Sequence, residues 1–151
     1  MTLLAESLEL WSPSNGYAFE IVSGGPNDLP VFRGENVTLP SKEGQTYMTK
    51  IADHLPIVLH GQIVGEASGG TTAAQSFRTR MDALNDIVHP DGGQFTLTIT
   101  GIEGLADDES ATLTVEWLRY TTIQRGAHYR YFDIECQCLS DPPGWTVTSG
   151  S

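Results

Sequence analysis

The stretch YRYFDIECQCL, residues 129–139, alternates between two kinds of side chain and is followed by the prolines of DPPGW, residues 141–145. Successive side chains of a strand point to opposite faces, so one face would carry an apolar row. That row is Phe132, Ile134, Cys136 and Cys138. Such alternation is typical of antiparallel sheets with one wet face. The stretch therefore predicts a long, half-buried strand in a mainly antiparallel protein.

Similar patterns recur along the chain and predict further strands. They cover residues 3–11, 17–22, 57–65, 95–100 and 112–123, with shorter extended pieces at 31–33 and 37–39 that suggest a hairpin. In the first of them, Leu4, Leu8 and Leu10 are expected on one side. Gly61, inside a run rich in β-branched residues, predicts a bulge or the close approach of another backbone.

One helix is predicted, over about residues 72–89. Thr72 and Gln75 fit a capping box, in which two side chains satisfy the first free backbone donors. Four apolar residues then form a single stripe: Phe77, Met81, Leu84 and Val88. A stripe this narrow packs one face of a helix onto a sheet. The expected fold is mainly β (α+β), an antiparallel β-sandwich or split barrel with this helix and an extended hairpin.

Length, charge and hydropathy limit the class of protein. The 151 residues suit a single domain, expected over residues 1–145, with 146–151 as a short flexible tail. The formal net charge of −11, with only eight basic residues, argues against wrapping nucleic acid. No apolar run is long enough to span a membrane, and the first residues lack the basic start of a signal peptide, which favours folding in the cytoplasm.

The search for reaction or metal motifs gives no candidate. Residues 65–69, GEASG, miss the register of a nucleophile elbow by one position. The histidines, at positions 54, 60, 89 and 128, have no paired-ligand spacing. The acidic run 107–109 lacks the spacing of a calcium loop, so a solvated hairpin tip is expected. We therefore expect no enzyme, no catalytic or cofactor-binding residues, no cofactor and no metal ligands.

The two cysteines and the aromatic residues have structural interpretations. Cys136 and Cys138 would face the same side of a strand, where a bridge between them would distort the backbone, so buried free thiols are expected. Four aromatic residues are candidates for a contact surface: Trp11, Tyr47, Tyr120 and Trp145. Trp and Tyr dominate interface hot spots, although the same residues could simply cover the core.

Several short motifs follow one another in a fixed order. They are Arg33-Gly34-Glu35-Asn36, the 37–40 strand, the Gly44 turn, Leu59-x-Gly61, the helix from Phe77 to Val88, two long strands, and Asp141-Pro142 after the last strand. In this order they resemble the N-terminal, ring-forming domain of distal tail proteins of long-tailed (siphovirus-type) phages, and especially the short minor tail proteins of phages that infect actinobacteria. The resemblance covers about residues 29–143.

The resemblance implies a structural virion protein. Family members form a hexameric ring at the distal end of the tail, joining the tail tube protein to the tip or baseplate hub protein, and an extended hairpin reaches a neighbouring copy. The chain would then fold in the host cytoplasm before assembly into the virion, and genomic DNA would pass through an acidic lumen without specific binding. Many members continue into a galectin-like domain, which is not expected here, and a Ser41–Gly44 turn replaces their usual Pro-Gly turn.

Two other functions remain open on sequence grounds. A tail tube or tail terminator protein uses a related β-barrel with a helix and also forms sixfold rings. A carbohydrate-binding β-sandwich module, a protein of another class, would instead stay monomeric and display an exposed aromatic platform.

Overall fold

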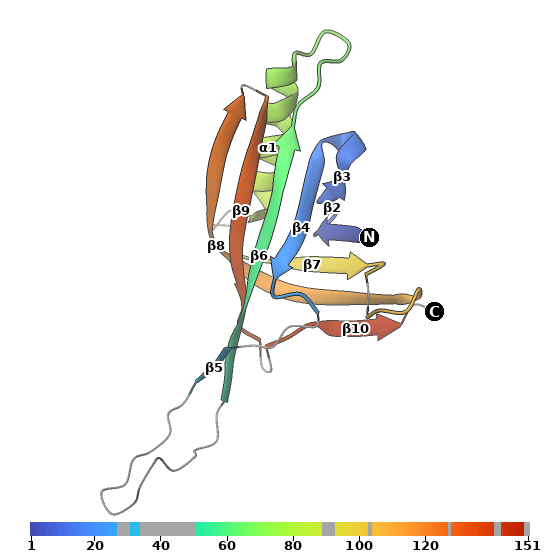
Figure 1. Ribbon diagram of the computed structural model, residues 1–151, viewed down its shortest axis with the longest axis vertical. Coiled ribbons are helices and arrows are strands. Elements are labelled where there is room, and N and C mark those ends of the chain that lie inside the picture. The colour runs from blue at the N-terminus through green and yellow to red at the C-terminus, as the bar shows by residue number, and fades with distance from the viewer. Residues whose placement is uncertain are drawn as a thin grey trace, which may run out of the picture.

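The computed structural model describes residues 1–26, 31–33, 51–88, 93–102, 104–126, 128–140 and 143–149. In these parts the chain forms one α-helix, a short 3-10 turn and a sheet of ten strands (Figure 1). The strands are Thr2–Ala5 (β1), Leu8–Glu9 (β2), Trp11–Ser12 (β3), Tyr17–Ser23 (β4), Val31–Arg33 (β5), Ile51–Val64 (β6), Gln94–Thr100 (β7), Glu109–Gly126 (β8), Tyr129–Cys138 (β9) and Thr146–Ser149 (β10). The helix is Ala73–Val88 (α1), and Pro13–Asn15 form the 3-10 turn (η1). The expected mainly β, α+β class is confirmed.

The strand order is β2-β1-β7-β8-β9-β6-β4-β3, with β10 paired to β8 and β5 paired to β6. All the pairs are antiparallel. Strand β8 serves both halves of the sheet, because residues 110–116 pair with β7 and residues 116–126 pair with β9. Figure 1 shows β7 and β10 running across the direction of β4, β6 and β9. The sheet thus bends around a shared interior without closing into a barrel.

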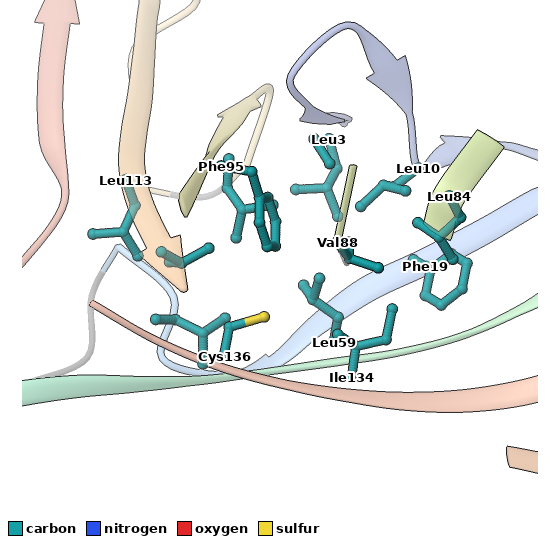
Figure 2. Packing of buried hydrophobic residues seen from close by; sticks show 14 of the residues in the cluster. Leu3, Leu10, Phe19, Leu59, Leu84, Val88, Phe95, Leu113, Ile134 and Cys136 are labelled. Carbon is teal, nitrogen blue, oxygen red and sulfur yellow. The ribbon is translucent and has the colours of Figure 1, made fainter. Parts of the chain in front are cut away.

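The two halves of the bent sheet share one core. The predicted row of β9 is buried, and β7 and β8 contribute similar rows: Phe132, Ile134, Cys136 and Cys138 on β9, Phe95, Leu97 and Ile99 on β7, and Leu113 and Val115 on β8. Figure 2 shows Phe95 and Leu113 from one half, and Leu59 and Ile134 from the other, pointing into the same interior. A core that joins both halves explains why alternation in sequence was a reliable guide, since each strand has one dry face.

Helix α1 is placed by its cap and by its apolar stripe. The Thr72 hydroxyl accepts the Gln75 N–H at 3.2 Å, and the Gln75 side chain accepts the Thr72 N–H at 2.9 Å, so the predicted capping box is confirmed. Phe77, Leu84 and Val88 are buried, and Met81 packs against them. Leu84 and Val88 point into the core in Figure 2.

A polar contact also ties α1 to the sheet. The Tyr17 hydroxyl of β4 donates to the carbonyl of Arg80 at 2.8 Å, and the Arg80 guanidinium donates to the carbonyl of Val64 at the end of β6. Burial raises the pKa of Tyr17, which keeps this phenol a neutral donor. The helix is therefore fixed to the sheet by both apolar and polar contacts.

The N-terminal segment corrects one prediction. Residues 3–11 were expected to form one strand with Leu4, Leu8 and Leu10 inward, but β1 and β2 form a hairpin that turns at Glu6, whose φ is +53°. As a result Leu3 and Ala5 are buried in place of Leu4 and Leu8, while Leu10 is buried as predicted. The Glu6 N–H donates to the Thr96 carbonyl, and the Glu6 carboxylate accepts the Thr96 N–H, both at 2.9 Å. These two bonds offset the strain of a non-glycine residue in the left-handed region.

The C-terminal segment also differs from expectation. The sequence predicts a short flexible tail over residues 146–151, but Thr146–Ser149 form β10 and pair with the start of β8. Just before it, the indole N–H of Trp145 donates to the carbonyl of Gly24 at 2.7 Å. This bond holds the segment against the end of β4, so it reaches the sheet edge as a strand.

The expected hairpin is described only at its base. Val31–Arg33 form β5, as predicted, and pair with the start of β6, where both strands lead away from the body of the protein (Figure 1). The predicted 37–39 strand and the motif around Gly44 lie outside the described residues.

Candidate interaction surfaces

The second half of β8 is an open strand edge that carries apolar side chains. Beyond residue 116 it pairs with β9 on one side, and no other strand of the described chain pairs with its second side. Leu118 and Tyr120 are 45% and 42% exposed there. Open edges with exposed apolar residues favour pairing with another chain. We call residues 117–122 the β8 edge.

A register shift determines which side chains lie at the β8 edge. Trp117 pairs with Cys136, but Arg119 already pairs with Glu135, so Leu118 is an extra residue in the ladder. The shift turns Arg119 outward, where it forms an ion pair with Glu135. Its hydrogen bond to that carboxylate raises the pKa of Arg119. Such bulges redirect side chains at sheet edges.

The same shift builds an aromatic row that runs from the core to the β8 edge. The ring of Tyr120 lies 6.0 Å from Phe132 and 5.9 Å from Trp117. The indole nitrogen of Trp117 is buried and has no hydrogen-bond partner among the described residues. The row makes the edge aromatic and apolar, which is typical of the anchor residues of protein interfaces.

The outer face of β6, β8 and β9 is polar and largely self-paired. His60 Nδ1 lies 2.5 Å from Asp133, and Gln137 donates to Glu116 at 2.5 Å. Of the other histidines, His54 contacts Asp53 at 2.8 Å, and the His128 ring makes an edge-to-face contact with the ring of Tyr129. His89 lies outside the described residues. No group of three potential metal ligands occurs in the part of the chain that the structure describes.

The two cysteines and the acidic run 107–109 have structural roles. Cys136 and Cys138 are buried free thiols, as predicted, and burial raises the pKa of Cys136 to about 12. Asp107 and Asp108 form the turn before β8, and Glu109 accepts the Ala106 N–H at 2.7 Å, as expected for a hairpin tip.

The predicted contact aromatics do not form one surface. Trp11 and Tyr120 are exposed on different strands, whereas Trp145 is half-buried against the core. Tyr47 lies outside the described residues. The residue that sequence analysis missed is Leu118, because its exposure depends on a bulge that alternation cannot reveal.

No protein-family model matches the chain, and no curated protein sequence matches it. Among solved structures, it is similar to SPP1 Dit (gp 19.1), described as a paradigm of the hub adsorption apparatus in phages that infect Gram-positive bacteria. The TM-score is 0.62 at 16% identity. The chain shares its fold with a phage hub protein. This confirms, for the fold, the resemblance to phage tail proteins found in the sequence.

The extent of the match is also informative. It covers 93% of this chain but 50% of SPP1 Dit, so the chain spans half the length of that protein. The shared part therefore includes nearly all of the bent sheet and α1.

No helix in the described part of the chain is long and apolar enough to cross a membrane.

Proposed function

We propose that the chain is a structural component of a phage tail. The observation that carries the proposal is the fold match to SPP1 Dit over 93% of the chain. The order of short sequence motifs over residues 29–143 supports the same role. The proposed role is mechanical rather than enzymatic, and the proposed location is the virion after folding in the host cytoplasm.

Within the tail, we propose a ring of six copies at the distal end that joins the tail tube to the tip or baseplate hub. A closed ring needs a heterologous interface, in which one patch meets a different patch on the next copy. The β8 edge supplies one such patch, since it offers free strand positions beside Leu118 and Tyr120. In the ring, these side chains would be buried against the neighbouring copy.

The net charge supports a lumen through which DNA passes. A chain of charge −11 repels phosphate groups, and it lacks the clustered Lys and Arg that release counterions from DNA. We propose that acidic residues line the channel of the ring. A map of the assembled ring with a basic lumen and an acidic outer belt would contradict this.

The oligomeric state tests the ring. Light scattering of the purified chain at rising concentration should show assembly beyond the monomer, and Leu118→Lys should shift the equilibrium toward monomer by placing a charge in the interface. Thr114→Lys is the matched control, because Thr114 is an exposed residue of the same strand in its first half. A wild-type chain that stays monomeric, or equal effects of both variants, would contradict the proposed interface.

The axial position tests the role. Cryo-electron microscopy of the virion should show one layer of this protein at the tail tip. Stacked copies along the tail would assign it to the tube instead, and a layer at the head end would indicate a terminator.

A further inference from the structure

Two hollows on the surface share one lining residue, Glu20 of β4. The first has a volume of about 260 Å³ and is lined mainly by apolar residues: Met1, Val22, Pro26, Ile99 and Ile102. The second, of about 180 Å³, is lined by Trp11, Ala18, His60, Gln62 and Tyr131. Glu20 lines both. We call the two hollows together the Glu20 groove.

Register explains why the second hollow exists. Trp11 pairs with Ala18, and Ala18 pairs with Gln62, so a small side chain lies between two large ones on the outer face. Trp11 is 39% exposed beside this gap. The next pair on this face is Glu20 with His60, and both residues line the second hollow.

Glu20 differs from the other carboxylates nearby. Asp133 contacts His60, and Glu135 forms an ion pair with Arg119. No salt bridge or hydrogen bond joins the exposed side chain of Glu20 to another side chain in the described part of the protein. A free carboxylate beside an exposed indole is suited to a cationic group, because the face of a Trp ring attracts cations.

The edge of β4 next to the groove is also open. On this side of β4, strand β3 pairs only with Tyr17 and Ala18. One further backbone hydrogen bond follows, from the Phe19 N–H to the Leu10 carbonyl, and no later residue of β4 has such a bond on this side among the described residues. Val22, farther along, is 55% exposed. An extended segment could add to such an edge by backbone pairing while alternate side chains enter the two hollows.

We propose that the Glu20 groove docks an extended segment of a partner protein, in which an arginine is flanked by apolar residues. The guanidinium would pair with Glu20 and lie against Trp11, and an apolar neighbour would enter the first hollow. Arginine suits this position because it combines ion pairing with stacking on an aromatic face. This inference does not depend on the proposed ring.

The described surface of a second copy matches this chemistry poorly. Arg80 donates to the Val64 carbonyl, Arg119 pairs with Glu135, and Arg130 lies 5.6 Å from the Phe77 ring. Arg78, on α1, lies 3.9 Å from Asp82. Each arginine whose side chain the structure describes thus has a contact within its own chain, so we assign the groove to a basic segment of a different protein.

The test uses a short fluorescent peptide in which one arginine lies between two valines, and a twin with citrulline in its place. Citrulline keeps the shape of arginine but carries no charge. We expect the fluorescence anisotropy of the arginine peptide to rise as the protein is added, with a Kd of about 1 mM or below. Hydrogen exchange should slow in residues 17–23. Glu20→Gln should weaken binding by about three- to five-fold, as expected for one partly exposed charge-assisted pair.

Asp86→Asn is the matched control, because it removes one exposed negative charge from α1. It should leave the Kd within about two-fold of wild type, which is the range of a general field effect. Equal binding of both peptides, equal weakening by both variants, or no binding at about 1 mM would overturn the proposal. So would a shift in self-association caused by Glu20→Gln, since that would place a second copy in the groove.

Discussion

Gly61 is a position where the structure predicts a large loss of stability from the addition of a single methyl group. It lies in the middle of β6, between Phe19 of β4 and Phe132 of β9. A Cβ added there would lie within 3.0 Å of the carbonyl group of Ala18 and the Cα of Phe19. These are backbone atoms, so no side chain can rotate to make room. The predicted close approach of another backbone at Gly61 is confirmed.

The cost of Gly61→Ala follows from this geometry. Forcing an extra methyl group into a packed site typically costs about 1–3 kcal/mol. Moving β4 away from β6 also weakens ladder hydrogen bonds, each of which contributes about 1 kcal/mol net. The lower chain entropy of unfolded alanine returns up to about 1 kcal/mol. We expect the free energy of unfolding to fall by about 3 kcal/mol.

Urea unfolding followed by circular dichroism measures this loss at a fixed protein concentration. With an m-value of about 2 kcal/mol/M, the midpoint should fall by about 1.5 M. Gly144→Ala is the matched control, because a Cβ at Gly144 meets no atom within 4 Å. Its midpoint should stay the same or rise slightly. A Gly61→Ala midpoint within about 0.3 M of wild type would refute the argument.

Three further experiments test the helix cap, the core and the buried thiol. Thr72→Ala should lower the free energy of unfolding by about 1 kcal/mol in the same urea assay, since it removes the acceptor for the Gln75 N–H, and Thr72→Ser should restore most of it. Phe132→Ala should cost about 3–5 kcal/mol, because its ring is buried against Phe19 and Tyr120, and a loss below about 1 kcal/mol would contradict that packing. Cys136, with its pKa raised to about 12, should resist thiol reagents at about pH 8 until the protein unfolds, as mass spectrometry of the modified residue can show. Because the folded pKa exceeds the ordinary thiol value of about 8.5, its contribution to stability is complete below about pH 8.5 and is lost as the pH rises toward 12.

The positions of strands and their inward-facing residues were predictable where side chains alternate between core and solvent along the whole strand. In β9, every second residue faces the shared core, so alternation alone identified the buried row. The helix was predictable for a similar reason, since its cap and stripe are local signals. The same rule failed over residues 3–11, where Leu4 and Leu8 continue an apolar pattern through a turn. That turn depends on a hydrogen bond from Thr96, a residue far along the chain.

The contact surfaces were less predictable because each depends on pairing between distant strands. Plain alternation through β8 would place Arg119 inward and Tyr120 outward, at the cost of burying a charge. The bulge at Leu118 avoids this by letting Arg119 meet Glu135, and it returns Tyr120 to Phe132. The exposed leucine is thus the consequence of keeping the arginine in water. If Arg119 were replaced by an apolar residue, the electrostatic reason for the bulge would disappear, and the β8 edge would lose the feature that makes Leu118 available to a neighbour.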